Sequence, residues 1–282
     1  MLPSLRALFS GRDPQIPQEL WAEQVRRMPW LQGWDAAELE SLRANSARFL
    51  AQKSMTGAAG LVLDAPMQLH IAAQACVPIS RLGLHWYRGW SGVIVYPASF
   101  LVHRSRHHPD GVVQEFDAEL TGEAWAGGPV VLSWEDAASV AVRGEGRPAP
   151  GGPAWAYNVV IHEFAHKIDL LDGEADGIPP FDARLHAGLG RKAWQSALED
   201  AYERFCAELD LVESGIPGDV DPESADADGY YAHLPLDPYA ASEPGEFFAV
   251  SSEAFFLDPG PMERAFPRWH DCLRRFYRPE AH

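Results

Sequence analysis

The sequence predicts an α+β fold in a single domain, residues 1–282, with a mixed α/β N-terminal lobe and a mainly helical C-terminal lobe. Short β-rich apolar runs bounded by glycine and proline lie at 92–102, 111–116 and 129–134. Apolar residues at helical spacing dominate the second half. The Gly/Pro-rich stretch GEGRPAPGGP at 144–153 separates these two patterns, so we expect the lobe boundary near 144–153.

Helical periodicity also defines the individual elements. Residues 17–53 predict two helices, with Asp35 as the N-cap of the second, and residues 66–79 predict a buried helix. A helix over 154–173 has Pro153 near its start and Gly173 just past its end. Further helices are expected at 186–212, 246–257 and 261–276, with an acidic loop at 213–235.

The charge balance argues against nucleic acid as a direct partner. The chain has 23 Lys and Arg against 40 Asp and Glu, a formal net charge of -17. Proteins that bind phosphates usually present a basic face, so neither nucleic acid nor an anionic membrane is expected to bind. No apolar stretch is long enough to span a membrane.

Cysteine usage and the N-terminus indicate a cytoplasmic protein. Cys76, Cys206 and Cys272 are few and widely spaced, and no CxxC pair occurs. This pattern favours reduced thiols over a disulfide framework. The apolar patch before Arg12 is too short for the hydrophobic region of a signal peptide.

The chemistry is carried by His162-Glu163-Phe164-Ala165-His166, an HExxH motif inside a predicted helix. Residues four apart share a helix face with Cβ atoms about 5–6 Å apart, so both imidazoles can bind one zinc ion. Glu163 lies about 100° around the helix and can reach a water on the metal. Zinc lowers the pKa of such a water to about 7, and the glutamate can accept its proton.

A third ligand is needed, because catalytic zinc sites usually have three protein ligands and an open position. The motif lacks a nearby third histidine. Glu246 and Glu253, seven residues apart on one predicted helix face, are both candidates, and Glu246 lies in the first turn, where the helix dipole favours a carboxylate. The weaker rivals are His186, His233 and His270.

Two other acidic features have open interpretations. Asp169 follows His166 by three residues, so it either orients a ligating imidazole or is a solvated end-of-helix residue. Ser224, Asp226 and Asp228 suggest a calcium loop, but Pro235 stands where the bidentate glutamate is required, so we favour a solvated acidic loop.

Several longer stretches resemble the Mlc titration factor A family of zinc peptidases. They cover most of the chain and comprise RFLAQK (48–53), GVIVYPASF (92–100), GGPVVLSWED (127–136), NVVIHEFAHKID (158–169), DPYAASEPGEFFAVSSEAFF (237–256) and FPRWHDCLRRFY (266–277). That family is similar in turn to the catalytic domain of anthrax lethal factor, which shares the glutamate helix. The segment before Tyr239 is longer and more acidic than the family pattern.

The resemblance implies a zincin-like (gluzincin) metallopeptidase. Carried over by position, His162, His166 and Glu246 are the Zn²⁺ ligands, Glu163 is the general base, and Tyr239 stabilises the oxyanion. By analogy with other zincins, the region of 129–134 is expected to provide the edge strand that pairs with the backbone of a peptide substrate.

The resemblance also bears on function. It implies an enzyme that trims peptides at the amino or carboxy terminus, an aminopeptidase being the commoner description, and an Mlc-type transcriptional repressor as a binding partner. Two alternatives stay open from the sequence: a regulatory binding protein that sequesters a repressor, and a zinc hydrolase that is not a peptidase.

Overall fold

The computed structural model describes residues 14–107, 113–120, 122–139, 155–222, 224 and 226–279. The first half contains short helices around a small sheet. The two helices expected at 17–53 are confirmed, and Asp35 caps the second through a capping box in which its Oδ1 accepts the N–H of Glu38 at 2.8 Å. The helices of this half are α2 (Gln18–Arg26), η1 (Pro29–Gly33), α3 (Ala36–Gln52), α4 (Ala65–Ala75), η2 (Leu84–Tyr87) and α5 (Trp134–Ala138).

Four strands form a mixed sheet in the order β1-β2-β6-β5. The first three run parallel, and β5 pairs antiparallel with β6. Val93 lies opposite Val130 and Val95 opposite Leu132, and all four side chains are buried. The strands are β1 (Ser54–Gly57), β2 (Gly92–Tyr96), β5 (Gly122–Ala124) and β6 (Val130–Ser133).

The prediction that 129–134 provides the edge strand is wrong. This segment forms β6, which is hydrogen-bonded on one side to β2 and on the other to β5. Among the described strands, the short β5 lies at this edge of the sheet instead. Every residue of β6 is buried, a pattern typical of an interior strand, whereas Gly122–Ala124 has too few β-branched residues to be recognised as a strand.

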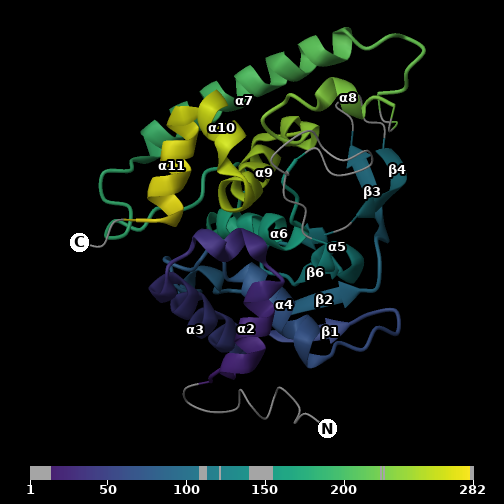
Figure 1. Cartoon of the computed structure of the whole chain (residues 1–282). Helices are drawn as coiled ribbons and strands as arrows, with labels where there is room; N and C mark the ends of the chain where they lie inside the picture. The colour runs from purple at the N-terminus through teal and green to yellow at the C-terminus, as the bar shows by residue number, and fades with distance from the viewer. Residues whose placement is uncertain are drawn as a thin grey trace.

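The apolar run at 92–102 divides into β2 and the start of a separate hairpin. β3 (Phe100–His107) and β4 (Val113–Leu120) pair antiparallel, with Phe100 opposite Leu120. In Figure 1 this hairpin extends from the sheet toward α8 in the helical half.

The second half is helical, as expected. Its elements are α6 (Val159–Asp169), η3 (Leu170–Asp172), α7 (Arg191–Ser214), α8 (Asp228–Tyr231), η4 (Pro238–Ala241), α9 (Pro244–Leu257), α10 (Pro259–Ala265) and α11 (Pro267–Tyr277). α6 begins later than predicted because Asn158 caps it, and Gly173 follows its end at φ 105°. α7 begins after Gly190 rather than at 186.

Helix α6 lies between the two halves (Figure 1), with the sheet and α2–α4 on one side and α9–α11 on the other. Its Phe164 is fully buried, and its ring packs against Phe49, Tyr87 and Trp90 of the first half at centroid distances of 5.0–5.7 Å. Its opposite face packs against α9. The HExxH residues therefore lie where the two halves meet.

Two further expectations concern the chain as a whole. The stretch at 144–153 lies outside the described residues. Among the helices that the structure describes, none combines the length and apolar character needed to cross a membrane.

Candidate metal centre and active site

The start of α6 is fixed by residues from two other helices. Asn158 accepts the N–H of Ile161 through its side-chain oxygen at 2.9 Å, and its Nδ2 donates to Gln74 of α4 at 2.6 Å. Its backbone N–H donates to the carboxylate of Glu253 on α9. These bonds set the direction of the first helical turn and hence of His162, four residues later.

The structure brings His162, His166 and Glu246 together. Nε2 of His162 lies 3.0 Å from Oε2 of Glu246, Nε2 of His166 lies 3.2 Å from the same oxygen, and the two Nε2 atoms are 3.2 Å apart. Ligands about 2.0–2.1 Å from a tetrahedral zinc ion are separated by roughly 3.3 Å, so these spacings fit three corners of such a site. Among the described residues, these three form the one group of His, Cys, Asp or Glu side chains whose ligand atoms lie close enough together to hold a metal ion.

The hydrogen-bonding roles of His162 support a cation at this point. Its Nδ1 lies 2.8 Å from Oε1 of Glu253, and a carboxylate only accepts, so Nδ1 carries the proton. In a neutral imidazole, Nε2 would then direct a lone pair at Oε2 of Glu246. Two acceptors at 3.0 Å repel each other unless a proton or a metal ion lies between them.

The pKa directions describe the same charge imbalance. Burial lowers the pKa of His162, but hydrogen bonds to Glu246 and Glu253 outweigh burial and hold that pKa well above its ordinary value. Burial raises the pKa of Glu246, yet bonds to His162 and His166 bring it well below its usual range. The donor set therefore fits a divalent ion that prefers imidazole and carboxylate ligands.

Glu253 is a buried partner of His162 rather than a surface charge. Only 2% of the residue is exposed, and its two oxygens accept from the His162 imidazole and from the backbone N–H of Asn158. This is the arrangement in which a carboxylate fixes the tautomer and orientation of a metal-binding imidazole. Of the two sequence candidates, Glu246 is the one whose oxygen reaches both histidines.

Asp169 has a different role from both sequence interpretations. It is fully buried, and its Oδ2 accepts the N–H of Gly177 at 2.7 Å rather than orienting an imidazole or facing solvent. The loop that it holds packs against the start of α9, where a Cβ added at Gly245 would lie 2.4 Å from the carbonyl oxygen of Ala175. Asp169 thus supports the helical turn that carries Glu246.

Glu163 is buried beside the edge strand. It is 5% exposed, and burial raises its pKa to about 7. Among the described residues, its Oε2 has no hydrogen-bond partner. A Cβ added at Gly122 of β5 would lie 2.5 Å from Oε1 of Glu163, so any other residue there would force the strand or the glutamate side chain to shift.

The turn between β5 and β6 is anchored to α6 by a buried cation. Lys167, which directly follows His166, is 2% exposed and donates to the carbonyl oxygens of Trp125 and Gly128, the latter at 2.8 Å. Burial lowers the pKa of Lys167 to about 8. Lys167 therefore ties the turn that follows β5 to the helix that bears the histidines.

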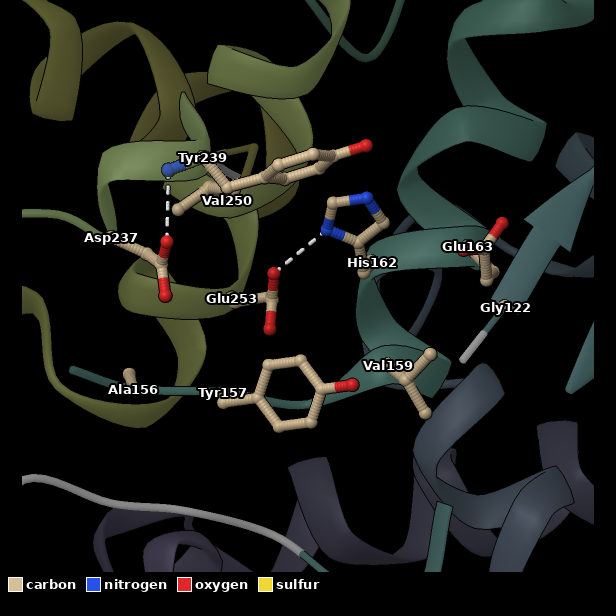
Figure 2. Close-up of a pocket in the computed structure, with 10 residues that line it drawn as sticks. All are labelled: Gly122, Ala156, Tyr157, Val159, His162, Glu163, Asp237, Tyr239, Val250 and Glu253. Carbon is tan, nitrogen blue, oxygen red and sulfur yellow. Dashed lines mark hydrogen bonds and ion pairs between the residues drawn. The ribbon is translucent and has the colours of Figure 1, made fainter. Parts of the chain in front are cut away.

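Tyr239 lies on η4, next to the histidines. Its ring centroid is 6.2 Å from that of His162, and 53% of the residue is exposed. Figure 2 shows its hydroxyl directed toward the side of His162 and Glu163, away from Asp237.

The other histidine candidates lie elsewhere. His186 stacks on Phe276 at 4.6 Å, His270 lies 3.8 Å from Glu263, and His233 is exposed. None joins the cluster. Sequence reasoning did not single out Asn158, Gly122 or Lys167. Asn158 had a usable signal, since an asparagine directly before an apolar helical run is a common N-cap.

A pocket of about 310 Å³ opens beside His162 and Glu163 (Figure 2). It is lined by Gly122, Ala156, Tyr157, Val159, His162, Glu163, Asp237, Tyr239, Val250 and Glu253. Of the three residues in the cluster, His162 lines this pocket.

Residues 6–278 match the family described as glucose-regulated metallo-peptidase M90. The chain belongs to this family. Proteins named Mlc titration factor A, from Yersinia pestis (strain Pestoides F) and Yersinia pseudotuberculosis serotype O:1b (strain IP 31758), are each 30% identical to this M90 chain over 276 residues. The match covers 97% of this chain and 90% of each relative. The resemblance inferred from the sequence is thus confirmed, and the cluster lies in a metallopeptidase of family M90.

Replacing Gly122 with alanine tests the contact between β5 and Glu163. The added Cβ forces the strand or the carboxylate to move, so we expect peptide hydrolysis to fall by about 10²-fold. Metal content should not change, because the cluster is carried by α6 and α9. Gly33→Ala is the matched control, since a Cβ there meets nothing within 4 Å. Unaltered hydrolysis in Gly122→Ala would refute the contact.

Metal binding should release protons near pH 7. His162 has a raised pKa and is protonated without metal, whereas a ligand must present a lone pair, so zinc affinity should rise with pH up to that pKa. Calorimetric titration of zinc in buffers of different ionisation enthalpy measures the release. The exposed His233→Gln variant should release as many protons as the wild type. Zinc binding with no proton exchange would contradict this charge assignment.

Proposed function

We propose that this chain is a zinc-dependent peptidase of the gluzincin type, with His162, His166 and Glu246 as zinc ligands and Glu163 as the general base. The single observation that carries the proposal is the convergence of three donor atoms from α6 and α9 within 3.0–3.2 Å of one another, beside a buried glutamate. Membership of a metallopeptidase family supports it.

In this mechanism, a bound zinc ion would polarise the scissile carbonyl and the attacking water. Glu163 takes a proton from that water as its oxygen bonds to the carbonyl carbon, and then donates the proton to the nitrogen when the C–N bond breaks. Glu163 must be ionised to begin this cycle. A pKa near 7 suits a group that alternately accepts and releases a proton.

In the proposed mechanism, three further groups assist substrate binding and catalysis. The Tyr239 hydroxyl, on an exposed side chain next to His162, donates to the oxyanion that develops on the carbonyl oxygen. Strand β5 pairs with the extended substrate backbone, because it lies at the edge of the described sheet, beside Glu163. Glu253 keeps His162 in the tautomer that presents Nε2 to the metal.

We further propose that the enzyme trims peptides from the amino terminus in the cytoplasm. The support for amino-terminal trimming is the resemblance to the Mlc titration factor A family. The support for the compartment is that Cys76, Cys206 and Cys272 are all free thiols.

Glu163→Gln tests the general base. The amide cannot accept a proton, so hydrolysis of aminoacyl-anilide substrates should fall by about 10²–10⁴-fold while zinc stays bound. Turnover and metal content are measured on the same preparation. Glu199→Gln, on an exposed part of α7, serves as the control and should leave both unchanged. Wild-type turnover in Glu163→Gln would remove Glu163 from the mechanism.

Comparing Glu246→Ala with Glu253→Ala tests the third ligand. Loss of a direct ligand should remove most of the zinc after dialysis, whereas loss of a supporting carboxylate typically weakens affinity by about 10–100-fold. Metal analysis of both variants gives the order. If Glu253→Ala retains less zinc than Glu246→Ala, the third ligand has to be reassigned.

A second candidate function is binding to an Mlc-type transcriptional repressor. Two relatives at 30% identity carry the name Mlc titration factor A, and the net charge of -17 suits a basic protein surface. If binding and catalysis are independent, Glu163→Gln should retain a purified Mlc-type repressor in a pull-down as well as the wild type does. Loss of the repressor in that variant would place its binding at the active site.

A further inference from the structure

The pocket beside His162 combines apolar lining residues with acidic ones. Ala156, Val159, Val250 and the ring of Tyr157 supply the apolar surface. In Figure 2, Asp237 and Ala156 lie on one side of the pocket, while Glu163 and Gly122 lie on the other, beyond His162. A side chain that enters this side of the pocket would therefore meet both hydrocarbon and a carboxylate.

Glu253 and Asp237, the two acidic residues on this side of the pocket, differ in how many of their carboxylate oxygens already accept hydrogen bonds from the protein. Both oxygens of Glu253 accept hydrogen bonds from within the protein. Asp237 uses Oδ1 to accept the backbone N–H of Tyr239 at 2.9 Å. Figure 2 shows its other oxygen directed away from that amide. No basic side chain among the described residues forms an ion pair with Asp237.

Asp237 is partly buried, so water hydrates its carboxylate incompletely. Burial raises the pKa of Asp237, and the Tyr239 amide and the charge of His162 only partly oppose that effect. A ligand cation next to the carboxylate would favour its ionised form and form a charge-assisted hydrogen bond with the oxygen that points away from Tyr239. An apolar stem with a charged tip matches lysine and arginine, which bury their methylene groups and keep a charged end group.

We propose that this pocket binds a positively charged group of a peptide substrate next to the scissile bond, and that Asp237 is the residue that recognises it. The apolar walls favour a lysine or arginine side chain as the source of the charge. The α-ammonium group of a peptide terminus is the other source of the same chemistry. This inference rests on the proposed peptidase function and specifies its substrate class.

The test uses short alanine peptides that contain one lysine, placed in turn at each position. Each peptide is compared with its Nε-acetyl-lysine analogue and with its Nα-acetylated form. Binding is measured by calorimetry on zinc-loaded Glu163→Gln protein, so the result does not depend on turnover. Hydrolysis of the same peptides by wild-type enzyme is measured separately as kcat/KM.

Asp237→Asn is the informative variant, because the asparagine oxygen can still accept the Tyr239 N–H. Asp64→Asn is its matched control: Asp64 also accepts a backbone N–H, that of Met67 at the start of α4, and lies outside the pocket. Thermal melts of both variants verify that each is folded.

We expect Nε-acetylation of lysine to weaken binding by about tenfold or more, as for loss of a hydrogen bond between charged groups. Asp237→Asn should abolish this difference and Asp64→Asn should retain it. If Nα-acetylation weakens binding instead, and Asp237→Asn again abolishes the difference, Asp237 still binds a cation, and that cation is the α-ammonium group of the peptide.

Two results would overturn the inference: binding that is insensitive to both acetylations, or a preference for the cation that survives in Asp237→Asn. If wild-type enzyme hydrolyses no peptide but the Asp237-dependent preference persists in binding, the proposed peptidase function fails while the cation site stands. The two failures are therefore distinguishable.

Discussion

The site depends on one buried carboxylate that connects two helices. Glu253 of α9 accepts the backbone N–H of Asn158, where α6 begins, and the imidazole N–H of His162, one turn later. Burying a carboxylate is unfavourable unless its oxygens are hydrogen-bonded, and both oxygens are. Because Glu246 lies seven residues before Glu253 on the same helix, the contact that orients His162 also sets the position of Glu246 relative to α6.

Electrostatics explain why a metal ion belongs at this helix contact. The carboxyl groups of Glu163, Glu246 and Glu253 lie around two imidazoles and exceed them in number. A divalent ion would balance the excess and join a helix that packs on the sheet to one that belongs to the helical half. Binding energy of that kind contributes to folding as well as to chemistry.

The sequence was most informative where one helix carries a complete pattern. The HExxH helix and the helix with both glutamates are confirmed, since each is long and periodic, and spacing alone places His162 and His166 on one face. Choosing between Glu246 and Glu253 from the residues required the relative positions of α6 and α9, which no local pattern contains. The same limit applies to Asp169, whose partner Gly177 lies in a loop with no regular pattern.

The error over the edge strand has a related cause. Periodicity identifies a strand but does not reveal how many neighbours it has, and the true edge strand has only three residues. What brings β5 close to the buried glutamate is the absence of a side chain at Gly122. That feature is recognisable only once Glu163 is seen next to it.

The way the β5–β6 turn is anchored leaves its side chains free to differ between related enzymes. Lys167 holds the turn through carbonyl oxygens of the main chain, which every amino acid provides. Trp125, half exposed at the end of the strand, can therefore be exchanged for other residues without loosening the anchor. Variation at that position would remodel the surface beside β5 and leave the helix with the histidines undisturbed.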